Sequence, residues 1–230
     1  MSPRRDGGMQ NDVPIHEMTH GLTKRLTGGG TARCLLTLEA SGMGEGWSDA
    51  VSDWFSHTDT PEVRDFVVGQ WLAGNDAGLR DYPYSTDTSI NPLRYSSVAT
   101  LDEISVKSGE YIETLPSVDW TLTILFVNSQ ANILHNIYAA LVAEHGWSPT
   151  ARTNADGTDG NIVFLRLLVD ALSLQPCEPT MPIARDAWIQ ADQNRYDGAH
   201  KCLLWRVFAS RGLGVGAIDH VDSGDVPDDC

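Results

Sequence analysis

The stretch NDVPIHEMTHGLTKRL, residues 11–26, holds two histidines four positions apart, His16 and His20, with Glu17 directly after the first. Because an α-helix turns once every 3.6 residues, both imidazoles stand on one face and can bind one ion. Glu17 is rotated by about 100° from His16 and can reach a water molecule held on that ion. The spacing therefore predicts a catalytic zinc site with Glu17 as general base. The alternative is a polar stripe on a surface helix.

A catalytic zinc ion needs a third protein ligand, and the stretch SGMGEGWSD at residues 41–49 offers one. Glu45 lies near the start of a second predicted helix, and Asp49 follows on the same face. With Glu45 as ligand, Asp49 is free to accept a hydrogen bond from the second nitrogen of a ligand histidine. Asp12, four residues before His16, is predicted to give comparable support. The alternative is that these acids only complement the dipole at a helix N-terminus.

The hydrophobic pattern predicts a mainly α-helical fold with few strands. The expected helices are residues 13–26, 44–56, 131–145, 160–174, 181–196 and 201–214, and several are followed by glycine or proline. A long irregular loop is expected over residues 72–99, which are rich in Gly, Pro, Asn, Asp and Ser. Arg64, Arg80 and Arg94 flank or lie within this loop, and the sequence assigns them no role.

The overall charge narrows the class of partner. The chain has 230 residues, of which 41% are hydrophobic, and its 31 acidic and 16 basic residues give a net charge of −15. This charge argues against nucleic acid or an anionic membrane as a partner. Its apolar runs are far shorter than the roughly 20 residues of a membrane span. The opening MSPRRDGGMQ is not a signal peptide, so an export signal is expected outside the chain. We expect a monomer.

Four cysteines, Cys34, Cys177, Cys202 and Cys230, allow three pairings into two disulfides. None is in a CxxC pair, which argues against cysteine ligands to zinc. We favour Cys177 with Cys202, joining the last two helices, and Cys34 with Cys230, holding the acidic tail. Four buried free thiols are the alternative.

The other histidines have no partner at ligand spacing. His135 and His145 are predicted to pack within or at the end of a helix, and His57, His200 and His220 are predicted to lie on the surface.

The segments PIHEMTHGLTKRLTGG and ASGMGEGWSD resemble the signature of the fungalysin metalloendopeptidases, secreted fungal zinc proteases of the thermolysin-like group. The likeness extends to RDYPYSTDTSINPLRY and RGLGVGA and covers most of the chain. It implies that His16, His20 and Glu45 bind one Zn²⁺, with Glu17 as general base in peptide-bond hydrolysis. It also implies protein or peptide substrates, secretion, and an inhibitory propeptide outside this chain.

By this resemblance, residues 1–230 form a single partial catalytic domain, equivalent to the helical C-terminal half of a thermolysin-like protease. Its parts are the zinc helices at 11–56, a possible insertion at 104–130, a helical part at 131–217 and an acidic tail at 218–230. The family has an oxyanion-stabilising histidine after LDE, residues 101–103, where this chain continues with ISVKSGEY. We interpret 104–130 as an insertion, conceivably a translated intron; an ordinary loop and strand is the alternative.

Three functions follow from these observations. The first is a secreted zinc endopeptidase. The second is a truncated, catalytically inactive zinc-binding remnant of such a protease. The third, an unrelated binding module with acidic surface helices, would not bind zinc.

Overall fold

The structure, a computed structural model, describes residues 5–57, 59–99 and 120–230. The fold is mainly helical, as predicted. Its elements in chain order are η1 (Gly7–Met9), α1 (Asp12–Leu26), α2 (Leu38–Ser56), α3 (Gln70–Ala73), η2 (Tyr95–Val98), α5 (Trp120–His145), α6 (Gly160–Leu174), α7 (Met181–Tyr196) and α8 (Lys201–Ser210). Within the described residues, β pairing is limited to isolated bridges such as that between Phe66 and Tyr84.

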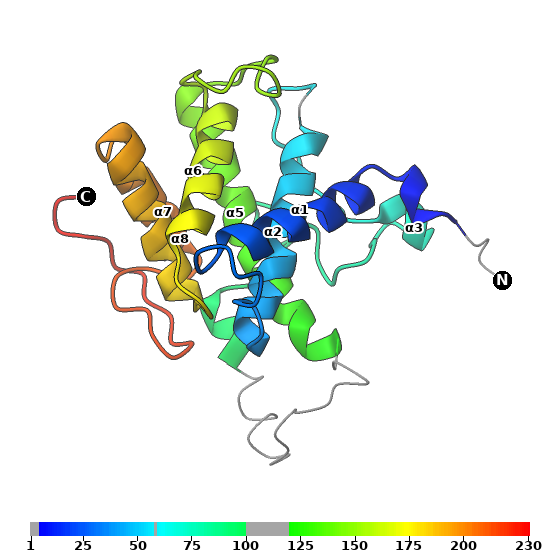
Figure 1. The fold of residues 1–230 in the computed structure, drawn as a ribbon, viewed down its shortest axis with the longest axis horizontal. Coiled ribbons are helices and arrows are strands. Elements are labelled where there is room, and N and C mark those ends of the chain that lie inside the picture. The colour runs from blue at the N-terminus through cyan, green and yellow to red at the C-terminus, as the bar shows by residue number, and fades with distance from the viewer. Residues whose placement is uncertain (1–4, 58, 100–119) are drawn as a thin grey trace, which may run out of the picture.

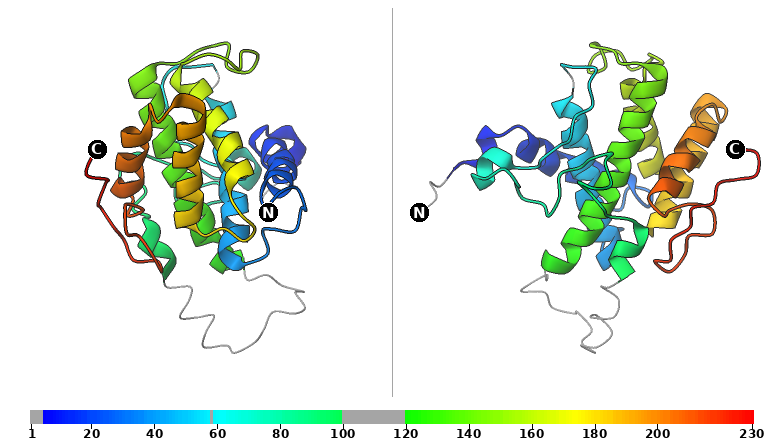
Figure 2. Two further views of the ribbon diagram at one scale, coloured as in Figure 1. Left: turned by 60° about the vertical axis from the view of Figure 1, so that its left-hand side comes forward. Right: turned by 180° about the vertical axis from the view of Figure 1, so that it is seen from behind.

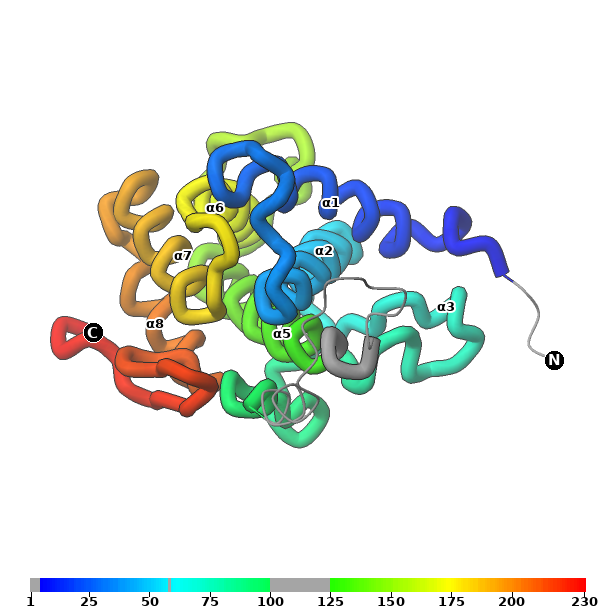
Figure 3. Tube along the Cα trace, turned by 60° about the horizontal axis from the view of Figure 1, so that its bottom comes forward, coloured from blue at the N-terminus to red at the C-terminus, as the bar shows by residue number. Residues whose placement is uncertain are grey.

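Helices α2 and α5 form the centre of the molecule. Helix α1 crosses α2, and α6 packs against α5 with α7 and α8 beyond it (Figures 1 and 3). The first described residues, from residue 5 on, and the C-terminus lie on opposite sides of the molecule (Figure 2, right). The apolar core between the helices includes the fully buried rings of Trp47, Trp54 and Trp188. This core fixes α2, the helix that carries the carboxylates of the predicted zinc site. None of the described helices is both long and apolar enough to span a bilayer.

Helix α2 starts at Leu38, six residues before the predicted start at residue 44. Thr37 caps the helix, because its side chain accepts a hydrogen bond from the main-chain nitrogen of Ala40 at 3.3 Å. Gly46, within this helix, serves packing. A Cβ on Gly46 would lie 2.9 Å from the Cβ of Gln130, so the glycine lets α5 approach α2 closely.

Helix α5 begins at Trp120, whereas residue 131 was predicted. Residues 120–130 of the predicted insertion are therefore helical, and residues 104–119 lie outside the described residues. Phe126 and Val127 are buried, which explains why the helix extends into this apolar segment.

The predicted disulfide pairings are wrong. Cys34 is bonded to Cys177 and Cys202 to Cys230. The loop after α1 lies against the turn between α6 and α7, where Glu178 donates its main-chain N–H to the carbonyl of Cys34 at 3.0 Å. The acidic tail returns to the first turn of α8, where Lys201 binds Asp229 at 2.7 Å. The pairing follows this tertiary arrangement, which cysteine spacing does not encode.

Two histidines predicted to lie on the surface are buried, and His220 is also largely covered. His57 lies against Asp53, and His200 Nδ1 is 2.6 Å from Asp192 Oδ1. Buried imidazoles need polar partners, and each of these aspartates supplies one. His135 is buried within α5, as predicted, and His145 lies partly buried at its end.

Candidate metal centre

The crossing of α1 and α2 brings His16, His20 and Glu45 together. His16 Nε2 lies 3.0 Å from His20 Nε2 and 3.0 Å from Glu45 Oε2, and His20 Nε2 lies 3.2 Å from Glu45 Oε1. Three atoms that each bind one tetrahedral Zn²⁺ at 2.0–2.1 Å lie about 3.3 Å from one another. The separations and the two-nitrogen, one-oxygen donor set therefore fit zinc. Three protein ligands would leave a fourth position for water.

The buried Asp49 fixes the orientation of the His16 ring. Its Oδ1 lies 2.7 Å from His16 Nδ1, and the carboxylate has no exposed surface. When Nδ1 donates its proton to Asp49, the lone pair of Nε2 faces His20 and Glu45. A carboxylate behind a histidine in this way also increases the basicity of the ligating nitrogen.

His20 has a weaker partner behind it. Its Nδ1 lies 3.3 Å from Ser48 Oγ, and that hydroxyl donates to the carbonyl of Gly44 at 3.1 Å. Because the hydroxyl hydrogen is used in this way, Ser48 accepts from His20 Nδ1. The two histidines are thus supported differently, His16 by a charged group and His20 by a neutral one.

Sequence reasoning missed two residues that hold Asp49. Arg80 donates from Nε and Nη2 to the two carboxylate oxygens, at 2.7 and 3.0 Å, and the Tyr84 hydroxyl also donates to this carboxylate. Both residues lie in the loop that was predicted to be irregular. The segment RDYPYSTDTSINPLRY was the only signal for them, because a chain's spacing does not show where a loop returns to a helix.

The charges of this cluster are strongly coupled. Burial lowers the pKa of the His16 imidazole, but hydrogen bonds and charge attraction from Asp49 and Glu45 outweigh it and raise the pKa to about 9. Burial raises the pKa of the Glu45 carboxyl, yet hydrogen bonds with His16 and His20 bring it well below its ordinary range. For Asp49, the His16 hydrogen bond and the Arg80 charge likewise outweigh burial and lower the pKa. The surroundings thus favour a cation beside His16 Nε2, and a metal ion would replace the proton there.

Glu17 is exposed on α1, directly after the buried His16. The side chain of Asp12 contacts other groups than the sequence predicted. Its Oδ2 accepts from the main-chain nitrogen of Gly69 at 2.7 Å and from Gln10 Nε2 at 2.9 Å. Its contacts in the described part of the chain thus connect α1 to the segment before α3 rather than to a ligand histidine.

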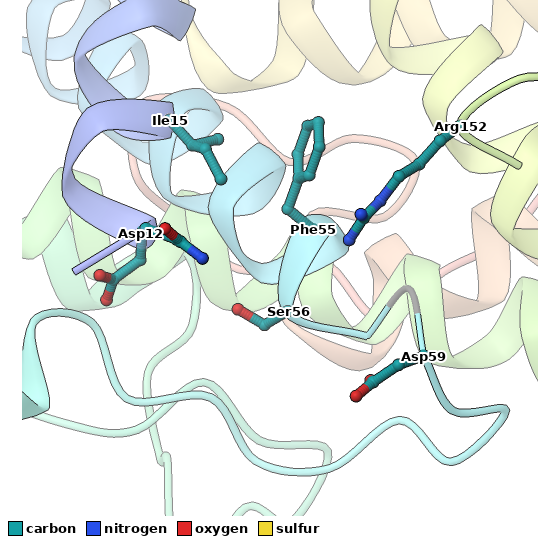
Figure 4. Close-up of a pocket in the computed structure, with 7 residues that line it drawn as sticks. Asp12, Ile15, Phe55, Ser56, Asp59 and Arg152 are labelled. Atoms are coloured by element: carbon teal, nitrogen blue, oxygen red, sulfur yellow. The ribbon is translucent and has the colours of Figure 1, made fainter. Parts of the chain in front are cut away.

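A cavity of about 470 Å³ lies beside Asp12 at the first turn of α1 (Figure 4). Its lining comes from α1, the end of α2 and the loops after α2 and α5, and the guanidinium carbon of Arg152 lies 5.4 Å from the centroid of the Phe55 ring. None of His16, His20 and Glu45 lines this cavity, so it is separate from the metal cluster.

Comparison with known proteins gives a consistent result over nearly the whole chain. The family model described as Fungalysin metallopeptidase (M36) matches residues 1–217. The chain is 39% identical over 99% of its length to "Extracellular metalloproteinase mep" of Aspergillus flavus and 41% identical over 94% to "Extracellular metalloproteinase MEP" of Pyricularia oryzae. It is 40% identical over 100% of its length to "Extracellular metalloproteinase 4" of Arthroderma otae. The chain spans about a third of the length of these relatives, 32–34%.

Proposed function

Because the chain belongs to the fungalysin metallopeptidase family, we propose that it is the zinc-binding helical part of a secreted endopeptidase that cleaves peptide bonds in proteins. The observation that carries this proposal is the convergence of His16, His20 and Glu45 from two crossing helices. Protein or peptide substrates are proposed from the names of the relatives, which are metalloproteinases.

His16, His20 and Glu45 would hold one Zn²⁺ per chain. When bound, Zn²⁺ lowers the pKa of water and polarises a carbonyl group. Asp49 would keep His16 Nε2 aimed at the cluster, and Ser48 would do the same for His20. Glu17 would accept a proton on its carboxylate from the attacking water and deliver it to the nitrogen of the leaving amine.

We propose secretion because the relatives are named extracellular and because the two disulfides fit an oxidising compartment. We keep as proposals a monomer, an inhibitory propeptide outside this chain, and the absence of nucleic acid or membrane partners. The net charge of −15 supports the last of these.

The alternative is an inactive zinc-binding remnant of such a protease. The sequence ISVKSGEY, which stands where the resemblance implies a histidine, favours this alternative. Both functions share the metal cluster, so only an activity measurement separates them.

The test compares zinc content and peptidase activity of the full chain with those of Glu17→Gln. We expect one zinc in each protein and an activity loss of about 10²–10⁴-fold in the variant. Glu39→Gln, an equal change on α2 away from the cluster, is the matched control and is expected to retain activity. One bound zinc with equal background rates in wild type and Glu17→Gln would refute the peptidase and support the remnant. Absence of bound zinc would refute both.

A further inference from the structure

The loop that holds Asp49 is itself held by buried polar side chains that have no hydrogen bond to the metal cluster in the described residues. Tyr84 is fully buried and exchanges two main-chain hydrogen bonds with Phe66, at 2.9 and 3.0 Å. Directly after Tyr84, the main-chain nitrogen of Ser85 donates to Asn132 Oδ1 at 2.9 Å, and its carbonyl accepts from Asn136 Nδ2 at 3.1 Å. Asn132 and Asn136 are one turn apart on α5, so they bind both polar groups of one residue.

Arg211, at the end of α8, completes this arrangement. The residue is 1% exposed, and its Nη2 donates to the carbonyls of Ser85 and Thr86 at 2.9 and 3.2 Å. Its Nη1 donates to the carbonyl of Asn91 at 2.7 Å, and its Nε and Nη2 reach Asn136 Oδ1 at 3.4 and 3.2 Å. All of these acceptors are neutral oxygens: three main-chain carbonyls and one side-chain amide.

Asp87 acts on Arg211 through its charge, but no carboxylate accepts a hydrogen bond from the guanidinium in the described part of the chain. Burying a guanidinium in this way is costly, so its position requires a reason beyond charge balance. Its planar donors are fixed in one fork, which a flexible ammonium cannot reproduce. Here the guanidinium of Arg211 donates to main-chain carbonyls at both ends of residues 85–91. These hydrogen bonds set the position of the chain that follows Tyr84. Tyr84 and Arg80 in turn donate to Asp49, which orients His16.

We propose that Arg211, together with Asn132 and Asn136, is a positioning residue for the metal centre, acting through Tyr84 and Asp49. This inference rests on the proposed function, because it assigns the cluster a bound Zn²⁺. Arg211 touches none of His16, His20 and Glu45 in the structure. Its contribution is to keep the support of His16 rigid.

The test uses Arg211→Lys in the full chain, with Arg185→Lys as matched control. Arg185 is also buried, and its Nη1 donates to the carbonyls of Leu213 and Gly214 at 3.2 and 2.7 Å, away from the loop. We expect both variants to lower Tm, but only Arg211→Lys to weaken zinc binding, by about tenfold. It should also change the d–d absorption of the Co²⁺-substituted chain and speed hydrogen exchange at the Tyr84 amide.

A second variant and a combined variant keep the test decisive. Asn136→Ala removes one partner of Arg211 and should also weaken zinc binding, even if Arg211→Lys fails to fold. In a Tyr84→Phe background, Arg211→Lys should weaken zinc binding less than it does alone, because the route to Asp49 is already broken.

Two results would overturn the inference in different ways. Wild-type zinc affinity and Co²⁺ spectrum in folded Arg211→Lys and Asn136→Ala would refute the positioning role and leave the proposed function intact. A wild-type chain that binds no zinc would refute the proposed function and this inference with it.

Discussion

Helix α2 carries two fully buried aspartates one turn apart, Asp49 and Asp53, and each lies 2.7 Å from the Nδ1 atom of a histidine from another helix. At Asp49, the free nitrogen of His16 meets His20 and Glu45. At Asp53, the partner is His135 of α5, and the described residues there do not bring three ligand atoms within 4.8 Å of one another, as His16, His20 and Glu45 do. An aspartate–histidine pair is therefore not by itself a metal site. The convergence of further ligand atoms on the second nitrogen makes the difference.

The second cluster, formed by Asp53, His57 and His135, connects parts of the fold to one another. His57 Nδ1 lies 3.0 Å from both Asp53 Oδ1 and the main-chain oxygen of Asp53, and its hydrogen bond goes to the latter. His57 Nε2 accepts from the main-chain nitrogen of Arg64 at 3.0 Å, and the His57 carbonyl accepts from Trp147 Nε1 at 3.0 Å. Both nitrogens of His57 are thus occupied by protein groups. This cluster joins α2 to α5 and to the loops that follow each helix.

The largest expected difference between the clusters is in zinc affinity. Glu45→Gln replaces a charged ligand with a neutral amide, and we expect zinc affinity to fall about a thousandfold, roughly a third of the free energy typical of a structural zinc site. Competition with a chromophoric chelator at fixed pH measures this. Glu39→Gln, on the first turn of the same helix, and Asp53→Asn should bind zinc like wild type. Equal affinities for Glu45→Gln and Glu39→Gln would show that Glu45 is not a ligand.

For the free energy of unfolding, the larger effect is expected at Asp53. Asp53→Asn should lower the free energy of unfolding by about 3 kcal/mol, because a buried imidazole loses its charged partner. Burial raises the pKa of Asp53, but the charge and hydrogen bond of His135 outweigh burial and lower it from its ordinary value of 3.8. A lowered pKa contributes stability that is complete above pH 3.8 and is lost as the pH falls below it.

Urea unfolding of wild type and Asp53→Asn across this range measures that dependence. The difference between the two proteins should be largest near neutral pH and should shrink as the pH falls below about 4. A difference that stays constant down to acid pH would mean that the Asp53 charge contributes nothing to folding.

The sequence predicted those parts of the molecule that depend on local geometry. The bounds of α6 and α7 were as predicted, since apolar periodicity and the following proline or glycine define them. The shared face of His16 and His20 follows from helical spacing alone. The contact of Arg80 and Tyr84 with Asp49 could not be predicted, because it depends on how an irregular loop folds back. The disulfide pairing and the burial of His200 could not be predicted for the same reason.

Asp53 carried a local signal that the prediction did not use. It precedes His57 by four residues. Within a helix, four residues place an acid and an imidazole on the same face. The same rule that predicted the metal cluster would therefore have moved His57 from the surface to a buried pair.

The smallest expected effect concerns the different support of His16 and His20 within the metal cluster. Ser48→Ala removes the neutral acceptor behind His20, and we expect zinc affinity to fall only about fivefold, the equivalent of one neutral hydrogen bond. The control is Ser52→Ala, one turn further along α2, since the Ser52 hydroxyl donates to the carbonyl of Asp12 at 2.8 Å and is equally buried. It should bind zinc like wild type. If Ser48→Ala weakened zinc binding as much as loss of the charged Asp49 is expected to, about 10–100-fold, then charge would not be what distinguishes the support of the two histidines.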